Sequence, residues 1–364
     1  MAKTVLVAGA SGLVGTAAVD AFLAAGWDVI ALSRRKPEVF SQREFTHLSV
    51  DLRDARACEE CFSKLDRVSH VVYTAVYEKP GLIAGWQDQE QMDTNLAMLQ
   101  NLVEPLAKAA RLEHVTVLQG TKAYGVHLHA IRIPARERYP RDNHANFYWL
   151  QEDYIKAKSA QAGFGWTIFR PTVVLGPNVG VVMNVIPIIG IYAALCREEG
   201  LPFGFPGHIP YVREAVDTRL IANAAVWAAV TPQARGEHFN LTNGEAFSWR
   251  DLWPSMAQFL GVESAPDRPV SMATHLPSRA ELWDRIVERH GLRKLKMAEL
   301  IGESHHYADF GFGYGLKQAP PPAFVSTVKV KQAGFTDTYD TEFAVKHWLG
   351  VLMDRKIIPR PTPA

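Results

Sequence analysis

The chain has 364 residues, of which 48% are hydrophobic, so it can bury a substantial core and is not a disordered protein. Its formal net charge is +1, so charge gives no reason to expect nucleic acid or an acidic partner. The three cysteines give no disulfide framework and fit a reducing compartment. Because residues 1–4 lead straight into an apolar run and leave no room for a signal peptide, we expect a cytoplasmic protein.

The first predicted element is an apolar strand over residues 5–8, which leads into three glycines and then into a helix. In such a turn the first glycine permits a sharp bend, the second lets a pyrophosphate approach the backbone, and the third lets helix and strand pack closely. The helix N-terminus offers N–H groups and the positive end of its dipole to an anion. The pattern predicts a dinucleotide-binding turn, against the alternative of a glycine-rich turn without a ligand. The predicted contacts are Gly9, Ser11, Gly12, Leu13, Val14 and Gly15.

The end of the second predicted strand, over residues 27–33, indicates which cofactor the turn binds. A chain that binds NAD carries an acidic residue at this point for the ribose hydroxyls. This chain has Ser33, Arg34 and Arg35 instead, and arginine suits a ribose 2′-phosphate. We therefore expect NADPH/NADP, the alternative being a solvated basic loop that continues through Lys36.

Strand-like and helix-like segments then alternate. Strands are predicted over 68–74, 114–119 and 166–170, and helices over 91–109 and 152–161. This alternation predicts a doubly wound parallel sheet of the Rossmann type, which binds its ligand at the carboxyl ends of the strands. The further cofactor contacts predicted there are Asp51 (alternatively a helix N-cap), Leu52, Thr74, Ala75, Gln119, Gly120, Tyr148, Pro171, Thr172 and Val173.

The second half of the chain is mixed in pattern and predicts a smaller substrate-binding cap. We expect residues 1–177 to form the dinucleotide-binding domain, with 213–246 returning to it. Residues 178–212 and 247–358 would form the cap, followed by a tail over 359–364.

Three patterns are interpreted as structural. No charged residue occurs from Pro171 to Cys196, but prolines, asparagines and glycines interrupt the run, so we expect a buried loop and helix rather than a membrane span. Neither the pair Cys58 and Cys61 nor the pair His305 and His306 has enough companion ligands for a zinc site, so we predict no metal.

A tyrosine and a lysine are the candidate catalytic residues. Short-chain dehydrogenases usually carry Tyr-x-x-x-Lys on a helix, where the lysine lowers the pKa of the tyrosine and the tyrosine exchanges a proton with the substrate oxygen. The literal match, Tyr154 to Lys158, lies late in the helix, and we expect it on an exposed face. Tyr148 is better placed, at the helix start, but Glu152 stands four residues after it. Lys122, at the end of the preceding strand, supplies a cation from the opposite side, so we predict Lys122 and Tyr148 as the pair.

Each candidate also has a structural alternative. Lys122 is alternatively a solvated lysine at a strand end, and Tyr148 a packing aromatic beside Phe147. We expect Glu152 and Asp153 to stabilise the helix N-terminus.

Several motifs accompany the displaced lysine. They are Gly9, Gly12 and Gly15; Ser33-Arg34-Arg35; Leu118-Gln119-Gly120-Thr121-Lys122; Asn146-Phe147-Tyr148 with Glu152-Asp153; Arg170-Pro171-Thr172-Val173-Val174-Leu175-Gly176; Phe239-Asn240-Leu241-Thr242-Asn243-Gly244 with Trp249; Gly334-Phe335; and Ile357-Ile358-Pro359. With these motifs nearly the whole chain resembles the progesterone 5β-reductase / iridoid synthase family of atypical extended short-chain dehydrogenases. One departure is Trp149, where the family often has a second tyrosine.

The resemblance implies NADPH-dependent reduction of a carbon–carbon double bond conjugated to a carbonyl, with Lys122 and Tyr148 stabilising the enolate oxygen. The same groups would serve a carbonyl reductase or epimerase of this fold, which is one alternative; a non-catalytic NADP(H)-binding regulator is another. We expect a small apolar carbonyl-containing substrate, no nucleic-acid or membrane partner, and a homodimer. The predicted pocket residues are Trp149, Met183, Ile186 and Phe205.

Overall fold

The computed structural model describes residues 3–79, 86 and 88–361, and it divides into two compact units. The first unit contains the chain up to Thr172, together with Thr218–Leu241 and Ala323–Asp337. The second unit contains Val173–Asp217, Thr242–Pro322 and the chain from Thr338 onward.

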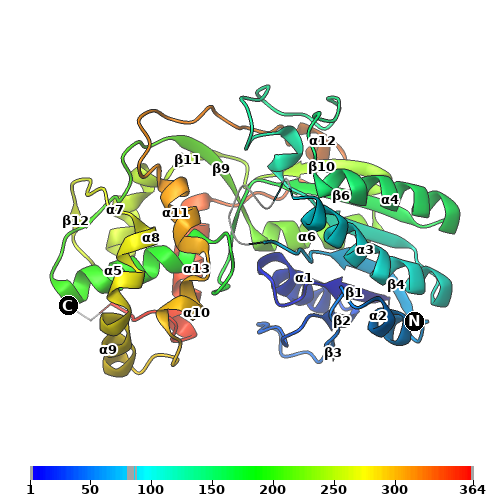
Figure 1. The fold of residues 1–364 in the computed structure, drawn as a ribbon, viewed down its shortest axis with the longest axis horizontal. Helices are drawn as coiled ribbons and strands as arrows, with labels where there is room; N and C mark the ends of the chain where they lie inside the picture. Colours follow the sequence, from blue (N-terminus) through cyan, green and yellow to red (C-terminus); the bar gives the residue numbers. More distant parts are fainter. Residues whose placement is uncertain (1–2, 80–85, 87, 362–364) are drawn as a thin grey trace. The chain divides into compact units, whose positions relative to one another are not determined.

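A seven-stranded sheet forms the centre of the first unit (Figure 1). Every neighbouring pair of its strands is parallel. The strand order is β10-β6-β5-β4-β1-β2-β3, so the order reverses beside β1, and a doubly wound sheet binds its ligand at such a point. The strands are β1 Thr4–Ala8, β2 Asp28–Leu32, β3 Thr46–Leu48, β4 Val68–Tyr73, β5 His114–Leu118, β6 Gly165–Pro171 and β10 Glu237–Leu241.

Helices cover both faces of this sheet because alternate strand residues are apolar on both sides. In β1, Val5 and Val7 join one hydrophobic cluster, whereas Leu6 and Ala8 join another. The first cluster is shared with α1 Leu13–Ala24 and α6 Thr218–Val230, and the second with α2 Ala55–Phe62, α3 Gln89–Ala109 and α4 Phe147–Ala162. The predicted fold class, a doubly wound parallel sheet, is thus confirmed.

The observed units differ from the expected division of the chain. Residues 173–177, 213–217 and 242–246, expected in the dinucleotide-binding domain, belong to the second unit. Residues 323–337, expected in the cap, belong to the first unit. Val325 pairs with Ala135, and α12 Val328–Gln332 contacts β10. The sequence of this segment has no periodic pattern that would assign it to a domain, and its contacts with the first unit do so instead.

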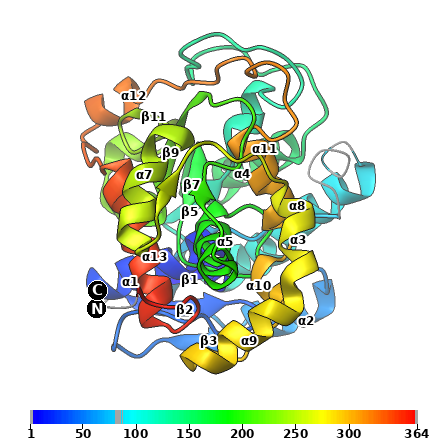
Figure 2. The same cartoon turned by 90° about the vertical axis from the view of Figure 1, so that its left-hand side faces the viewer.

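The second unit is built around α5 Val185–Glu199, whose residues 185–196 are all buried. Figure 2 shows the helices that surround α5, and α7, α9, α10, α11 and α13 contact it. The expected buried helix in the uncharged run is therefore present, and among the described residues no helix is long and apolar enough to cross a membrane. The other elements are β7 Val173–Leu175, β8 Phe203–Gly204, β9 Val212–Asp217, β11 Ala246–Ser248, α7 Trp249–Leu260, β12 Ser264–Ala265, α8 Met272–His275, α9 Ala280–His290, α10 Met297–Ile301, α11 Ser304–Phe312 and α13 Thr341–Asp354.

Candidate active site

The glycine-rich turn after β1 has the shape that a dinucleotide requires. Gly9 has φ +80°, and a Cβ on it would lie 2.7 Å from the backbone nitrogen of Ala75. A Cβ on Gly15 would overlap the carbonyl oxygen of Gly9, so this glycine lets α1 pack on the turn. A Cβ on Gly12 would lie 3.1 Å from that same oxygen. The three glycines thus leave a backbone surface that side chains would fill, which fits the close approach of a pyrophosphate.

Two arginines stand exposed where β2 ends. Ser33 Oγ donates a 2.6 Å hydrogen bond to the carbonyl oxygen of Arg35, which fixes the path of this segment. The side chains of Arg34 and Arg35 are exposed, and among the described residues neither guanidinium has a hydrogen-bond or ion-pair partner. Both cations therefore remain available to a phosphate group.

Asp51 forms an ion pair with an arginine and does not cap a helix. Asp51 Oδ2 lies 2.6 Å from Arg53 Nη2, and this hydrogen-bonded ion pair lowers the pKa of Asp51 to about 2. The N-cap of α2 is Asp54, whose side chain accepts from the backbone of Ala57. The alternative interpretation of Asp51 as an N-cap is therefore wrong, and Leu52 beside it is buried.

The remaining predicted cofactor contacts lie at the carboxyl ends of three strands. Thr74 and Ala75 follow β4, and Thr74 Oγ1 donates to the carbonyl oxygen of Ala8 at 2.8 Å. Gln119 and Gly120 follow β5 directly. Pro171 ends β6 and Thr172 follows it, whereas Val173 begins β7 in the second unit.

Lys122 and Tyr148 meet at one aromatic ring. Lys122 lies in the short 3₁₀ helix Thr121–Tyr124, and its Nζ is 3.4 Å from the centroid of the Trp86 ring. Tyr148 lies in the first turn of α4 and packs edge-on against the same ring, with 5.3 Å between centroids. Asn146 caps α4 by accepting from the backbone of Tyr148 at 3.0 Å. Among the described residues, neither Nζ of Lys122 nor Oη of Tyr148 has a hydrogen-bond or ion-pair partner.

Gly120 leaves space for the hydroxyl of Tyr148. A Cβ on Gly120 would lie 3.2 Å from Tyr148 Oη and 3.7 Å from the carbonyl oxygen of Pro171. The phenol therefore reaches the carboxyl ends of β5 and β6, where a ligand of this fold binds.

Burial changes the acidity of both candidate groups. It lowers the pKa of Lys122 to about 8, although the negative charge of Glu78 opposes the shift. Burial raises the pKa of Tyr148 well above its ordinary value, Glu78 adds to the rise, and Arg170 opposes it. Tyr148 is therefore a neutral hydrogen-bond donor at neutral pH, and Lys122 is a cation that loses its proton easily.

Two residues of this cluster were missed by sequence reasoning. Trp86 contacts both Lys122 and Tyr148, and its Nε1 donates to Glu78 Oε1 at 3.2 Å. Neither residue belongs to a periodic segment, so no pattern marked them; the one signal was a tryptophan and a carboxylate in the irregular stretch before α3.

The literal Tyr-x-x-x-Lys match lies elsewhere. Tyr154 Oη donates to Glu104 Oε1 at 2.8 Å, and Lys158 Nζ binds Glu104 Oε2 at 2.6 Å. Glu104 belongs to α3, so the packing of α3 on α4 partly buries both side chains. The expectation of an exposed helix face is therefore wrong, and the pair ties two helices together.

Glu152 does not act at the helix N-terminus as expected. It is only 4% exposed, and its carboxylate lies within 4 Å of Arg141, Lys156, Arg170 and His238. Burial alone would raise the pKa of Glu152, but contacts with His238, Lys156 and Arg141 outweigh it and hold the pKa well below its usual range. Glu152 is therefore the anion at the centre of a basic cluster, whereas Asp153 is largely exposed.

The predicted pocket residues belong to both units. Trp149 is buried in the first unit, and its Nε1 donates to the carbonyl oxygen of His144 at 3.0 Å. In the second unit Met183 is partly buried, whereas Ile186 and Phe205 lie in the hydrophobic core.

The cysteine and histidine patterns lie on structural helices. Cys58 is buried on α2, where burial raises the pKa of its thiol to about 12. Asp309, near His305, accepts from Ser271 and from the backbone of Met272, both at 2.6 Å. In the part of the chain that the structure describes, no three His, Cys, Asp or Glu side chains form a group that could hold a metal ion.

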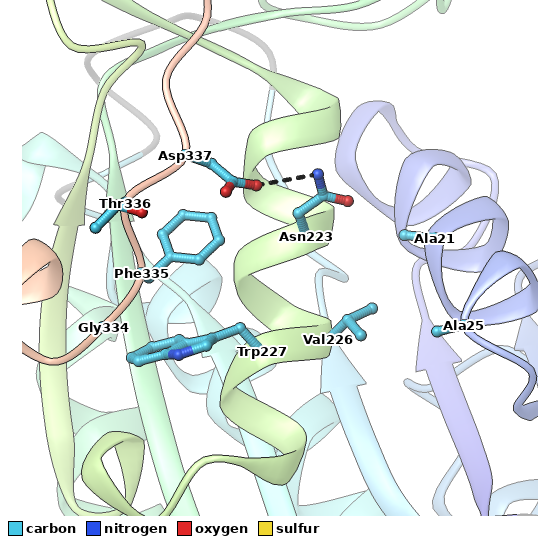
Figure 3. A pocket seen from close by; sticks show the side chains of 9 residues that line it. All are labelled: Ala21, Ala25, Asn223, Val226, Trp227, Gly334, Phe335, Thr336 and Asp337. Carbon is cyan, nitrogen blue, oxygen red and sulfur yellow. Dashed lines mark hydrogen bonds between the residues drawn. The ribbon is translucent and has the colours of Figure 1, made fainter.

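A pocket of about 370 Å³ lies on the other face of the sheet from α4, in the first unit (Figure 3). The ring of Phe335 lies over that of Trp227, and Asn223 donates to Asp337 at 3.4 Å. None of the predicted site residues lines it; its lining is Ala21, Ala25, Asn223, Val226, Trp227, Gly334, Phe335, Thr336 and Asp337.

Comparisons with known proteins show the family of the chain. The model of the NAD dependent epimerase/dehydratase family matches residues 5–242. An (S)-8-oxocitronellyl enol synthase of Camptotheca acuminata is 31% identical over 80% of this chain and 79% of the relative. A 3-oxo-Δ4,5-steroid 5β-reductase of Arabidopsis thaliana is 28% identical over 81% of this chain and 79% of the relative. These relatives confirm the resemblance seen in the sequence.

Solved structures agree on the fold. The UDP-glucose 4-epimerase of Thermotoga maritima superposes with a TM-score of 0.67 at 17% identity, over 96% of this chain and 99% of that one. The NAD complex of the UDP-glucose 4-epimerase of Thermus thermophilus gives a TM-score of 0.65 at 19% identity, over 95% and 98%. At this identity the likeness concerns the fold alone.

Proposed function

Because the chain belongs to the NAD dependent epimerase/dehydratase family, we propose that it is an NADPH-dependent reductase of carbon–carbon double bonds conjugated to a carbonyl. The observation that carries this proposal is the meeting of Lys122 and Tyr148 at the ring of Trp86, each with its polar atom unengaged by other described residues. The name of the Arabidopsis relative, a 5β-reductase of a 3-oxo-Δ4,5-steroid, describes reduction of such a double bond.

NADPH, when bound, supplies a hydride, and the glycine turn with Arg34 and Arg35 would hold it. The chain's own residues act on the substrate oxygen. As the β-carbon is reduced, negative charge collects on the carbonyl oxygen as an enolate. The phenol of Tyr148 donates a hydrogen bond to this oxygen, and the ammonium of Lys122 adds a positive charge. Each such donor contributes about 3 kcal/mol to stabilising the transition state.

Trp86 and Glu78 keep Lys122 in its charged form inside an apolar cluster. The face of an indole attracts an ammonium by about 0.5–2 kcal/mol, and Glu78 raises the pKa of Lys122 against burial. The lysine therefore stays mostly protonated at neutral pH while remaining poorly solvated, and a poorly solvated cation interacts more strongly with a developing anion.

The proposal is tested by NADPH oxidation with small cyclic and open-chain enones at pH 7. We expect Lys122→Met and Tyr148→Phe each to lower kcat about 10²–10³-fold. The matched controls are Tyr154→Phe and Lys158→Met, which remove the literal Tyr-x-x-x-Lys pair that Glu104 binds and should leave kcat within about twofold of the parent.

Product analysis separates this function from its alternatives. A saturated ketone supports the proposal, whereas an allylic alcohol would identify a carbonyl reductase. Tight NADPH binding without turnover on any enone would identify a regulator, and equal rates in the parent and both catalytic variants would remove these residues from the mechanism.

The substrate pocket and the cellular setting are part of the same proposal. We propose a small apolar carbonyl compound as the substrate and Trp149 as a residue that contacts it, so Trp149→Ala should extend turnover toward larger enones. Ile186 and Phe205, 0% and 2% exposed in the core of the second unit, are packing residues. Since its three cysteines are unpaired, we place the enzyme in the cytoplasm. A homodimer is proposed as its oligomeric state. Fractionation and sedimentation velocity check these two statements.

A further inference from the structure

The position four residues after Tyr148 holds an anion where the common Tyr-x-x-x-Lys pattern holds a cation. The oxygens of Glu152 lie 2.6 Å from Lys156 Nζ, 3.0 Å from Arg141 Nη2, 3.2 Å from His238 Nε2 and 3.5 Å from Arg170 Nη2. A lysine at this point would face these basic groups without a counterion. Position 152 therefore does not supply the positive charge that the common pattern places beside the tyrosine.

Arg170 is the buried member of this cluster. It stands near the end of β6 and is only 7% exposed. Its Nε donates to Gln119 Oε1 at 2.9 Å, and its guanidinium lies over the rings of Tyr124, at 5.1 Å, and Trp149, at 5.9 Å. A planar cation with a carboxylate, an amide and two rings around it has little freedom to move.

Gln119 connects Arg170 to Tyr148. Its Nε2 donates to the carbonyl oxygen of Tyr148 at 3.2 Å, and the same atom lies 3.3 Å from Glu152 Oε2. The next residue, Gly120, has its open side beside both Tyr148 Oη and the carbonyl oxygen of Pro171, the residue after Arg170. The backbone and the hydroxyl of Tyr148 are thus both placed against the strand ends that carry Gln119 and Arg170.

We propose that Arg170 supplies to Tyr148 the fixed positive charge that a lysine supplies in the common pattern, and that Glu152 and Gln119 hold Arg170 in place. All three act through Tyr148 and are positioning residues. Lys122 remains the cation that faces the substrate oxygen. This inference rests on the proposed reductase function and assigns its site a second, inner cation.

In support, the charge of Arg170 lowers the pKa of Tyr148, against burial and Glu78, which raise it. A phenol with a lower pKa is a stronger hydrogen-bond donor to an enolate. Replacing the arginine by a neutral residue would therefore weaken the donor and would also release the tie through Gln119.

The test compares Arg170→Gln with Arg170→Lys and with the control Lys156→Gln, using enone reduction by NADPH. Lys156 binds the same carboxylate but is 40% exposed and has no hydrogen bond to Gln119 or Tyr148. We expect Arg170→Gln to lower kcat about 30- to 100-fold with KM for the enone within about threefold, because misplaced donors affect the transition state more than substrate binding. Arg170→Lys should recover at least about fivefold of that loss, and Lys156→Gln should stay within about twofold of the parent.

A variant that leaves the ion pair of Arg170 and Glu152 in place guards against a loss of structure. Gln119→Met cuts the connection while Arg170 keeps its carboxylate, and it should lower kcat at least about tenfold. It removes amide hydrogen bonds to Arg170 and Glu152, so the free energy of unfolding should fall by about 1–3 kcal/mol, and kcat is compared under conditions in which the variant stays folded. A larger solvent deuterium isotope effect on kcat in Arg170→Gln and Gln119→Met, but not in Lys156→Gln, would separate a weakened proton donor from a general loss of structure.

The outcomes distinguish the two proposals. If the parent reduces enones and Arg170→Gln keeps kcat within about twofold, or Arg170→Lys is no better than Arg170→Gln, the positioning role is wrong and the reductase function stands. If the parent reduces no enone at all, the proposed function fails and this inference fails with it.

Discussion

Replacing Glu152 with glutamine should destabilise the first unit strongly, because a buried cation loses its carboxylate. Of the contacts to Glu152, Arg141 keeps Asp153 at 2.7 Å, and the partly exposed Lys156 can be hydrated. Arg170, at 7% exposed, keeps the amide of Gln119 and the rings of Tyr124 and Trp149 but loses its carboxylate. Removing one partner of a buried ion pair costs about 3–5 kcal/mol, so we expect Glu152→Gln to lower the free energy of unfolding by that amount.

The assay is urea unfolding at pH 7, followed by circular dichroism and analysed by midpoint and slope. The matched control is Asp153→Asn, the neighbouring carboxylate, which binds the same Arg141 but has a side chain 63% exposed. An exposed pair contributes about 0–1 kcal/mol, so the control should stay in that range. If Glu152→Gln loses no more stability than Asp153→Asn, the cluster around Glu152 does not stabilise the fold and the reasoning is refuted.

The effect of Glu152 on stability should also depend on pH. Its pKa in the folded chain lies well below the ordinary value, which is about 4.3 in an unfolded chain. Its contribution is therefore present above about pH 4.3 and is lost as the pH falls toward the folded pKa. The free energy of unfolding should fall more steeply between pH 5 and 3 in the parent than in Glu152→Gln, so the two should converge in acid.

Three further predictions concern activity and the cofactor. Gly120→Ala should lower kcat about tenfold or more, because the new methyl would lie 3.2 Å from Tyr148 Oη. Stability should change little, because the φ of −176° at this position suits any residue; kinetics and urea unfolding measure the two effects. Since burial lowers the pKa of Lys122 to about 8, kcat should fall as the pH rises through 8, and a rate profile of Lys122→Met should lack this limb. Replacing Arg34 and Arg35 by serine should weaken NADPH binding about 10- to 100-fold and leave NADH binding nearly unchanged in a titration of cofactor fluorescence, whereas equal losses for both cofactors would contradict their assignment to the 2′-phosphate.

Much of the first unit could be predicted from the sequence because its signals are local. The strand over 5–8, the glycines after it and the alternation that follows each depend on a few adjacent residues, and the parallel sheet is confirmed. The structure also brings Lys122 and Tyr148 to one tryptophan ring, from the strand end and helix start where the sequence places them.

The wrong interpretations concern residues whose environment comes from distant parts of the chain. Tyr154 and Lys158 have the spacing of an exposed pair, but Glu104, on another helix, binds both. Glu152 is an acidic residue of a kind common near helix N-termini. Its partners, however, include His238, which is 86 positions later in sequence (238 − 152). Spacing along a helix gives the relative direction of side chains but not what packs against them.

The charge cluster around Glu152 also restricts how such a chain can evolve. Introducing lysine at position 152 while Arg141, Lys156 and Arg170 remain would bury like charges together, and losing the arginines first would leave the buried carboxylate with only Lys156 and His238 among its described basic neighbours. Either first step removes several kcal/mol from a total of about 5–15 kcal/mol. A change of sign at the position four residues after the tyrosine would therefore pass through a destabilised intermediate.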